Sequence, residues 1–309
     1  MKTICKFGII LLLAIHNVQA KVLVMSYHYN RPDFIEIQHK TFEKFLEDDY
    51  EFVVFNDAKT PHLEQAIVHM CKKYNIKCIR INPEIHNHPY LQRWPGEGYN
   101  SPSVRCSNGV QYSLDTLAFD HQGLAVVMDS DMFLIRPFSI EKYMKNTDLA
   151  GVPQGRGNAH NRIRYVWIGL VFLNMNTLPE RRTINFNCGR VDGIPVDAGG
   201  CTHHYLKNHP EIKVKNIGIL HNQNTLCQEC RVSGKYRCTH NNKKLERLGF
   251  NKNEIDFLQI GPPNIEFLLN NTFLHYRGGT NWDNQSASFH NNKTSILNNF
   301  INTILSTNS

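Results

Sequence analysis

One stretch of the chain, residues 124–138, constrains the fold more than any other. Five apolar residues, Leu124 to Met128, run directly into Asp129-Ser130-Asp131, and a second apolar run follows and stops at Pro137. A short, unbroken apolar run is typical of a strand that is buried on both faces of a parallel sheet. In an open α/β sheet, ligands bind beyond the carboxyl ends of such strands. The two aspartates are therefore expected at a ligand site.

Asp129 and Asp131 would place two negative charges side by side. Two neighbouring carboxylates cannot both stay ionised unless something positive lies between them. A divalent cation that also holds phosphate oxygens meets this requirement. The alternative interpretation is an Asp-rich turn that ends one strand and starts a hairpin, because short motifs need context before they identify a site.

The first 20 residues have the pattern of a secretory signal peptide. Lys2 and Lys6 form a basic start, Phe7 to Ile15 is an apolar core, and Val18-Gln19-Ala20 is a small-residue cleavage site. Because a membrane-spanning helix needs about 20 apolar residues, an uncleaved anchor is the minority alternative. We predict one domain at 21–309, no later membrane-spanning segment, and export from the cytosol.

The cysteines fit an oxidising compartment. Cys5 leaves with the signal peptide, and an even number of cysteines remains. Cys71 and Cys78 flank a helix-to-strand turn and could pair. Another four residues have the spacing of a small zinc knuckle: Cys227, Cys230, Cys238 and His240. Exported proteins favour disulfides, so we prefer bridges over zinc for this cluster and leave their connectivity open.

The charge of the chain excludes one class of partner. Removal of Lys2 and Lys6 lowers the net charge from +7 to +5. The remaining Lys and Arg residues are scattered and form no long basic tract, so nucleic-acid binding is not predicted. A mildly positive balance suits a site for anionic phosphates.

The first half of the mature chain alternates strands with helices. Apolar runs predict strands at 21–27, 50–55, 76–81 and 124–128. Helices are expected from Pro32, from Pro61 with Thr60 as its N-cap, and over 103–122. Strand–helix alternation of this kind predicts an α/β fold with right-handed crossovers and a mostly parallel sheet.

The second half is more elaborate. We expect a short strand at 149–152, one or two buried strands within 165–175, and an irregular segment over 177–196. A short helix at 203–207, strands at 217–220 and 273–276, and a closing helix at 295–305 complete the chain. The long loop at 82–102 carries Tyr90, Trp94 and Tyr99, and a loop of this length is usually functional or mobile.

Two further clusters give the aspartates a context. His275-Tyr-Arg-Gly-Gly-Thr-Asn-Trp282 follows an apolar strand, and Asp197-Ala-Gly-Gly200 lies at an expected helix start. A histidine at a strand end can reach a metal while the following glycine amides close over a phosphate. Arg277 would add a charge-assisted contact. Taken singly, His275 could instead be a core histidine, Asp197 an N-cap and Trp282 a packing residue.

Together and in this order, these clusters resemble nucleotide-sugar glycosyltransferases of the GT-A fold, and most nearly the family 8 group and its relatives. The resemblance implies a Rossmann-like N-terminal half that ends in an Asp-x-Asp motif, which holds Mn²⁺ and the sugar diphosphate. Asp129 and Asp131 match that motif. His275, Gly278 and Trp282 match the family's late His-x-x-Gly motif, which supplies a metal-binding histidine. The lysine that precedes the tryptophan in the family is absent here.

The resemblance also implies roles for other residues. Arg105 would contact the diphosphate or sugar, Asp57 the base or ribose, and Arg277 with the Gly278 and Gly279 amides the leaving phosphates. Asp197 would orient the donor sugar or deprotonate the acceptor. Oxygen ligands suit Mn²⁺ or Mg²⁺, and the histidine favours Mn²⁺.

The expected reaction moves a sugar from a nucleotide-diphosphate donor to a glycan, protein or lipid acceptor, with retention of configuration implied by the family 8 group. The 82–102 loop could close over the donor or stack an acceptor sugar, or it could be a surface loop. Nucleotide sugars are plentiful in the cytosol and in the ER/Golgi lumen. We therefore expect a protein of the secretory-pathway lumen, or a secreted one that acts inside another cell.

Two other functions compete with this one. Haloacid-dehalogenase-type phosphatases also place Asp-x-Asp after an apolar strand, but they want Thr or Val where Phe133 stands, and no late paired-Asp motif occurs here. A non-catalytic, secreted glycan-binding protein could be built on the same scaffold, since a fold by analogy does not settle function.

Overall fold

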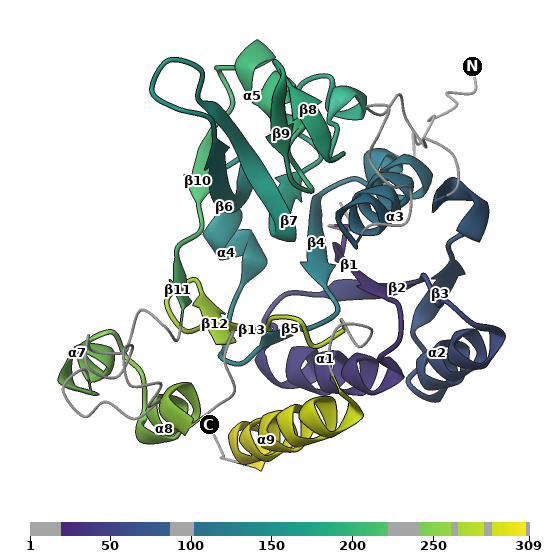
Figure 1. Ribbon diagram of the computed structural model, residues 1–309, viewed down its shortest axis with the longest axis vertical. Coiled ribbons are helices and arrows are strands. Elements are labelled where there is room, and N and C mark those ends of the chain that lie inside the picture. Colours follow the sequence, from purple (N-terminus) through teal and green to yellow (C-terminus); the bar gives the residue numbers. More distant parts are fainter. Residues whose placement is uncertain (1–19, 87–101, 222–241, 261–264, 281–285, 307–309) are drawn as a thin grey trace, which may run out of the picture.

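The computed structural model describes residues 20–86, 102–221, 242–260, 265–280 and 286–306 (Figure 1). Its centre is a seven-stranded sheet in the order β10-β6-β7-β4-β1-β2-β3. The strands are β1 (Val22–His28), β2 (Tyr50–Asn56), β3 (Lys77–Arg80), β4 (Leu124–Asp129), β6 (Leu149–Arg156), β7 (Ile163–Asn174) and β10 (Val214–Asn216). β7 runs antiparallel to both neighbours, and the other pairs are parallel. The predicted mixed α/β architecture with a mostly parallel sheet is confirmed.

A second sheet packs beside the first. Its order is β11-β12-β13-β5, and a separate β8-β9 ribbon lies near the top of Figure 1. The strands are β5 (Met132–Leu134), β8 (Gly189–Val191), β9 (Ile194–Val196), β11 (Ile219–His221), β12 (Ile265–Leu268) and β13 (Phe273–Tyr276). β5 pairs with β13 and not with β4. The Asp129-Ser130-Asp131 turn therefore connects two sheets and does not close a hairpin.

Helices lie on both faces of the large sheet and beside the small sheet (Figure 1). They are α1 (Pro32–Phe45), α2 (Pro61–Lys73), α3 (Pro102–Thr116), α4 (Ile140–Met144), α5 (Thr202–Asn208), α7 (Asn242–Arg247), α8 (Lys252–Ile260) and α9 (Ala287–Ser306). α1 and α2 begin at prolines, as predicted, and the Thr60 side chain accepts a hydrogen bond from the Leu63 amide at 3.4 Å. A proline at the first helical turn loses no helical hydrogen bond.

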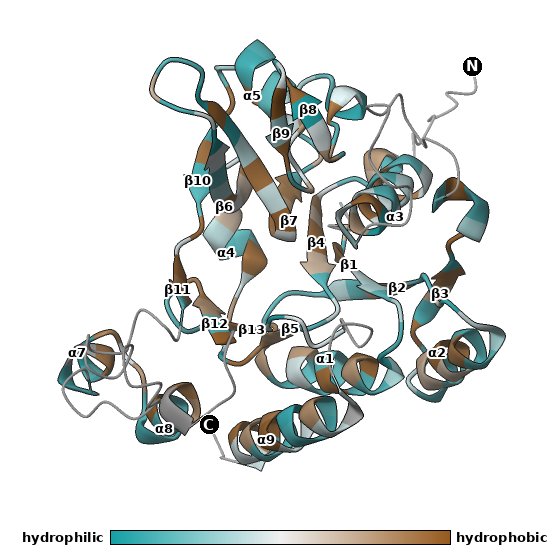
Figure 2. Ribbon diagram, viewed as in Figure 1, coloured by the Kyte–Doolittle hydropathy of each residue, from teal (hydrophilic) through white to brown (hydrophobic). Residues whose placement is uncertain are grey.

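The alternation of side chains along β1 divides the core into two layers. Val22 and Val24 pack on the face with α1 and the second sheet, whereas Leu23 and Met25 pack on the face with α3. Successive residues of a strand point to opposite faces, so a strand that is apolar throughout serves both layers. In Figure 2, β4 and β7 are largely brown, whereas α1 and α9 carry both brown and teal residues.

Several predicted boundaries are wrong. α3 ends at Thr116, not near 122, because Leu117 leaves the helical conformation at φ −139° and a 3-10 turn follows at Ala118–Asp120. β6 extends to Arg156, four residues beyond the predicted end, whereas the prediction of one or two strands within 165–175 agrees with the single strand β7, Ile163–Asn174. The segment 177–196, expected to be irregular, contains β8 and β9, and α9 begins eight residues early with the Ser286 hydroxyl accepting a bond from the Phe289 amide. Tertiary pairing and capping set these ends, not local periodicity.

Some predictions fall outside the described residues. These concern the signal peptide over 1–19, the aromatic side chains of the 82–102 loop, the cluster Cys227 to His240, and Trp282. Cys71 and Cys78 are thiols in the structure and hydrogen-bond to each other, so their pairing stays a prediction. None of the described helices has the combined length and apolarity that crossing a bilayer requires.

Candidate functional site

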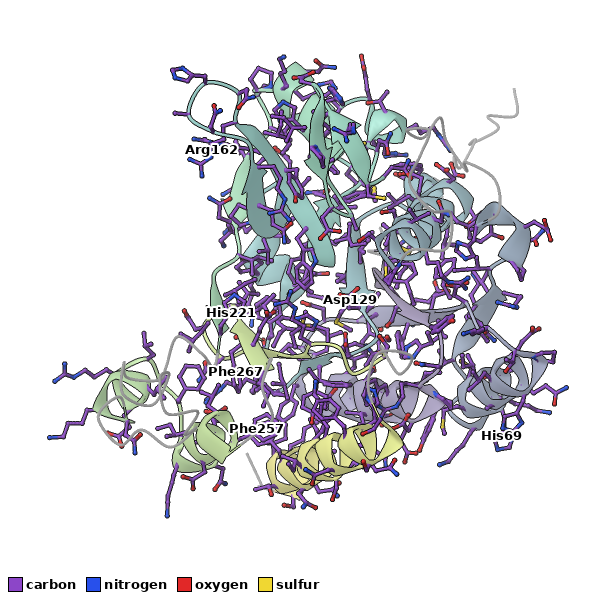
Figure 3. All side chains as sticks on the ribbon, in the orientation of Figure 1. His69, Asp129, Arg162, His221, Phe257 and Phe267 are labelled. Atoms are coloured by element: carbon purple, nitrogen blue, oxygen red, sulfur yellow. The ribbon has the colours of Figure 1, made fainter. Side chains whose placement is uncertain are left out.

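The turn between the two sheets brings three predicted residues together. Asp129 ends β4, Asp131 precedes β5, and His275 lies on β13 opposite Met132. Figure 3 labels Asp129 where β4 ends near the centre of the molecule. One ligand atom from each of the three residues lies within 4.8 Å of the others. Residues separated by about 145 positions in the chain thus form a compact set of two carboxylates and one imidazole.

The two aspartates differ in their charge state. Partial burial, followed by the neighbouring charge of Asp131, raises the pKa of Asp129 to about 7. Burial also acts to raise the pKa of Asp131, but the hydrogen bond and charge of His275 outweigh it and hold that pKa below its usual value. Two carboxylates at this distance cannot both be charged without a compensating cation.

His275 is held by a residue that the sequence did not single out. Glu266 on β12 accepts a hydrogen bond from His275 Nδ1 at 2.7 Å, and His275 Nε2 lies 3.5 Å from Asp131. Both Glu266 and His275 are 3% exposed. Burial lowers the pKa of His275, but its two carboxylate partners raise it overall to about 10. A carboxylate on Nδ1 fixes the ring so that Nε2 faces a metal.

Glu266 itself is fully engaged. Its second oxygen lies 2.8 Å from His221 Nδ1 on β11 and 3.4 Å from Arg277. Burial acts to raise the pKa of Glu266, but the hydrogen bond from His275 and the nearby positive charges bring it below its usual value. One indication of this role was present in the sequence: Glu266 is an acidic residue within the otherwise apolar strand Ile265–Leu268. A charged residue in a buried strand needs a partner, and this one has three.

A buried glutamine fixes the backbone of the turn. Gln38 on α1 donates from Nε2 to the carbonyl oxygens of Asp129 and Met132, both at 3.0 Å. Its own Oε1 accepts from His28 Nε2 at 3.1 Å. Because both carbonyls flank the aspartates, this side chain determines how the two carboxylates are presented.

The glycine segment after β13 wraps around Asp131. The amide of Gly279 donates to Asp131 Oδ2 at 3.0 Å, and the amide of Tyr276 donates to the Asp131 carbonyl at 2.8 Å. Gly278 has φ +73°, a conformation that favours glycine. The predicted proximity of Gly278 and Gly279 to the aspartates is thus present in the structure.

Two buried cations support this glycine segment from behind. Arg31 donates from Nη1 to the Gly279 carbonyl at 2.9 Å, and Lys293 on α9 donates to the Arg277 carbonyl at 2.6 Å. Lys293 is 3% exposed, and its ammonium lies 4.4 Å from the centre of the Tyr276 ring. Burial lowers the pKa of Lys293 to about 8, while the Asp131 charge acts in the opposite direction. Neither residue was predicted, because both reach the site through long-range contacts.

A cavity of about 330 Å³ opens over the aspartates. Asp57 and Arg105 also line it, and the Arg105 guanidinium donates to Asp57 Oδ1 at 2.8 Å and lies over the Tyr29 ring. His86 adds a second bond to the same Asp57 oxygen at 2.7 Å. The structure therefore places Asp57 and Arg105 in one cavity with the aspartates and His275, and their roles in binding a ligand stay predictions. Its volume is in the range of small-molecule sites.

Trp167 on β7 also lines the cavity, and the sequence analysis gave it no role. Its ring centre lies 5.2 Å from that of His275. The indole lies against Gly169, where an added Cβ would be 1.9 Å from the ring. A glycine two residues after a tryptophan in a buried strand was the available signal.

Asp197 is close to the cavity but does not line it in the described part of the chain. Its Oδ1 accepts hydrogen bonds from the Ser103 hydroxyl at 2.7 Å and from the Ala198 amide at 2.8 Å. Ser103 lies in the first turn of α3, next to the cavity residue Pro102. The catalytic role of Asp197 stays a prediction.

The donor set fits a hard divalent cation. Oxygen ligands are preferred by Mn²⁺ and Mg²⁺, and an imidazole nitrogen is accepted more readily by Mn²⁺. Burial and the Asp131 charge raise the pKa of Asp129, and a cation bound between the two carboxylates would favour their ionised forms. Asp129, Asp131 and His275 are the residues that would hold such an ion.

Comparison with known proteins gives no family model and no curated protein that matches the chain. Among solved structures, a mannosyltransferase from Pyrobaculum calidifontis in complex with GDP-Man and Mn²⁺ is 12% identical, with 65% of this chain and 55% of that chain covered and a TM-score of 0.38. Core-mannan synthase A from Aspergillus fumigatus, in its Mn/GDP form, is 9% identical, with 55% and 63% covered and a TM-score of 0.36. The WbbM bifunctional glycosyltransferase is 11% identical, with 53% and 33% covered and a TM-score of 0.36.

The similarity thus spans between 33% and 63% of the length of these three proteins. They are glycosyltransferases, the class that the sequence resembles, and they do not single out the family 8 group. Because all three TM-scores are below 0.5, we derive the function from the residues of the site itself.

Proposed function

We propose that this protein is a metal-dependent glycosyltransferase that uses a nucleotide-diphosphate sugar as donor. One observation carries the proposal: the ligand atoms of Asp129, Asp131 and His275 lie within 4.8 Å of one another in a cavity that Asp57 and Arg105 also line. A cation site beside a polar, partly cationic cavity suits a nucleoside linked to a diphosphate. The sugar would lie between the diphosphate and Trp167.

In the proposed reaction, the bond between the anomeric carbon and the diphosphate oxygen breaks, and a bond to an acceptor hydroxyl oxygen forms. A bound divalent cation supplies Lewis-acid neutralisation of the charge that develops on the leaving diphosphate. Arg277 and the amides of Gly278 and Gly279 would contact the phosphate oxygens. Asp57 and Arg105 would hold the nucleoside.

The acceptor hydroxyl must lose its proton as the new bond forms. Asp197 is the proposed base or sugar-orienting residue, since it accepts a hydrogen bond from Ser103, which follows the cavity residue Pro102 in the first turn of α3. A base must come within hydrogen-bond reach of the hydroxyl, so the Asp197 carboxylate would have to turn from Ser103 toward the cavity. We favour retention of configuration, on the resemblance of the motifs to the family 8 group.

We also propose that the protein acts in the lumen of the secretory pathway or after secretion, with its 20-residue leader removed. Its motif order over 21–309 is consistent with a single transferase domain. N-terminal sequencing of the protein from a secretory host tests the leader: a mature chain that begins at Lys21 is expected, and a retained Met1 would identify an uncleaved anchor.

The decisive experiment incubates the protein with Mn²⁺, a panel of UDP- and GDP-sugars and a set of glycan, peptide and lipid acceptors, and measures released nucleotide. Turnover with at least one donor, lost on chelation, is expected. Asp131→Asn should abolish Mn²⁺ binding, measured by electron paramagnetic resonance, while circular dichroism stays native. Mn²⁺ binding equal to the wild type in Asp131→Asn would move the metal site elsewhere. Glycan binding without any turnover would favour the non-catalytic alternative.

A further inference from the structure

The β6–β7 hairpin carries positive charge and no negative charge. No Asp or Glu occurs between Leu149 and Pro179, whereas Arg156, Arg162 and Arg164 lie near its tip and are exposed. Figure 3 labels Arg162 beside this hairpin, on the opposite side of the molecule from α2. Charges that look scattered in the sequence are thus gathered on one element.

Helix α5 adds to the same surface. His203 Nδ1 lies 2.9 Å from the Arg164 carbonyl oxygen, which joins α5 to the hairpin. A groove of about 710 Å³ lies between the hairpin, α5 and β10. Its lining includes five basic side chains and, among the described residues, no acidic one: Arg162, Arg164, His203, Lys207 and His209. We call this the basic groove.

Three of the basic side chains in the groove lack a carboxylate partner among the described residues. Elsewhere, arginines pair with carboxylates, as in Arg31–Asp33, Arg80–Glu64, Arg105–Asp57, Arg136–Glu254 and Arg182–Asp120. Across the part of the chain that the structure describes, Arg162, Arg164 and Lys207 make no such pair. Glu180 and Glu211 lie close to His209. Clustered like charges repel one another and raise the local concentration of anions.

We propose that the basic groove binds an acidic glycan through its carboxylate, sulfate or phosphate groups, and that this glycan is the acceptor or part of it. The role of the glycan as acceptor rests on the proposed glycosyltransferase function, whereas the binding itself does not. β7 connects the two places: Arg164 lies at the groove, and Trp167, three residues further on and roughly 10 Å away along a strand, lines the donor cavity.

The shape and lining of the groove favour a glycan over other polyanions. A hollow accepts a chain, whereas an anionic membrane is met by a flat or convex face with apolar side chains. Single-stranded nucleic acids bind to exposed aromatic platforms. Tyr165 is the sole Phe, Tyr or Trp in the described lining, and it is 1% exposed.

The test measures binding of full-length protein to fluorescent oligosaccharides at 150 mM salt. The probes are a sulfated heparin fragment, a carboxylated oligogalacturonate, a phosphorylated mannan fragment and neutral dextran. Binding to at least one acidic probe and not to dextran is expected. The variant Arg162→Ser/Arg164→Ser/Lys207→Ser should weaken acidic-probe binding by about tenfold or more, since three charge-assisted contacts are lost.

A matched control separates the groove from net charge. Lys72→Ser/Lys73→Ser/Lys77→Ser removes the same charge from exposed positions on α2 and β3, and it should change affinity less than about threefold. Equal losses in the two variants, or no acidic-probe binding by the wild type, would overturn the proposal. The proposal would also be overturned if the groove bound single-stranded RNA or phosphatidylserine vesicles more tightly than it bound any of the acidic glycans.

The outcome is also distinguishable from failure of the proposed function. The groove variant keeps every residue of the donor site, so its binding of Mn²⁺ and nucleoside diphosphate should equal that of the wild type. If a transferase reaction is found, the variant should raise the KM for an acidic acceptor and leave the KM for the donor unchanged. An unchanged acceptor KM would overturn the acceptor assignment while leaving the transferase intact.

Discussion

At the scale of single residues, the candidate site is a set of buried charges that balance only in part. His275 lies between Glu266 and Asp131, which accounts for one positive and two negative charges, and Asp129 adds a third acidic group. Burial, and after it the neighbouring charge of Asp131, raises the pKa of Asp129 to about 7. A bound divalent cation would complete the balance, which explains why so many ionisable groups are retained in one buried place.

Glu266 gives the first prediction at this scale. Glu266→Gln removes the charge that orients His275, so Mn²⁺ affinity should fall by roughly 10- to 100-fold while the fold is kept. Isothermal titration with Mn²⁺ measures the affinity, and thermal unfolding measures the fold.

A second buried glutamate provides the control for Glu266. Glu254 on α8 is 1% exposed and pairs with Arg136, away from the site. Glu254→Gln should lower stability and leave Mn²⁺ affinity at the wild-type value. If both variants lose the same Mn²⁺ affinity, or neither does, Glu266 has no positioning role.

His28 gives a prediction about pH. Burial lowers the pKa of His28 to about 4, so the folded protein keeps this ring neutral where the unfolded chain, with a pKa near 6.5, binds a proton. The stability that neutral His28 contributes is present above pH 6.5 and is lost as the pH falls toward 4. Between pH 7 and pH 5 this group alone should cost about 2 kcal/mol of unfolding free energy.

Urea unfolding at pH 7 and pH 5 checks the His28 prediction. Other groups titrate as well, so the comparison is between the wild type and His28→Gln, which cannot take up the proton. The variant should lose about 2 kcal/mol less than the wild type on acidification. Identical losses would show that His28 is not the responsible group.

At the scale of elements, α9 supports a loop that belongs to the site. Lys293 donates to the Arg277 carbonyl, and Arg31 at the start of α1 donates to the Gly279 carbonyl. Two carbonyls of the segment are therefore turned toward cations behind it, and the Gly279 amide is turned toward Asp131. The C-terminal helix thus shapes the segment that we propose to hold the diphosphate.

Lys293→Met tests this arrangement. The substitution keeps the apolar stem and removes the charged donor, so affinity for a nucleoside diphosphate should fall by roughly tenfold or more, while affinity for the nucleoside alone stays unchanged. Lys293→Arg should restore part of the diphosphate affinity. Fluorescence titration with UDP, GDP, uridine and guanosine makes the comparison.

Lys44 offers a matched control on α1. It also donates to backbone carbonyls, those of Ile304 and Leu305 at the end of α9. These bonds do not involve the glycine segment. Lys44→Met should lower the melting temperature without changing diphosphate affinity. A Lys293→Met variant that binds both ligand types as the wild type does would show that α9 has only a structural role.

At the scale of the whole molecule, the site joins the two sheets. Asp129 belongs to the large sheet, and His275 and Glu266 belong to the small one. A ligand held by both should stabilise the molecule as a unit, because binding to the folded state alone shifts the unfolding equilibrium.

Thermal unfolding with Mn²⁺ and a nucleoside diphosphate checks this coupling. At ligand concentrations about 100 times Kd, stability should rise by about 2.7 kcal/mol, or roughly 4 °C in a chain of this size. Asp131→Asn should show no rise, and chelation should abolish it in the wild type. A rise of equal size in Asp131→Asn would place the ligand at another site.

Features that depend on neighbouring residues in the chain could be predicted from the sequence, whereas features that depend on contacts between distant residues could not. The strand ending at Asp129, the proline starts of α1 and α2, and the strand Phe273–Tyr276 were predictable because each depends on a short apolar or capping pattern. The β8–β9 ribbon and the early start of α9 were missed. Tertiary pairing and side-chain capping stabilise them, and neither leaves a periodic pattern in the sequence.

The sequence by itself determined the chemistry of the Asp129-Ser130-Asp131 turn and of His275, because residue type and a preceding buried strand are local properties. Only the tertiary structure decided that β5 joins a second sheet, that Glu266 and Lys293 stand behind the site, and that scattered arginines form one groove. These are contacts between residues far apart in the chain. The packing of sheets and helices creates them, and one-dimensional spacing carries no information about that packing.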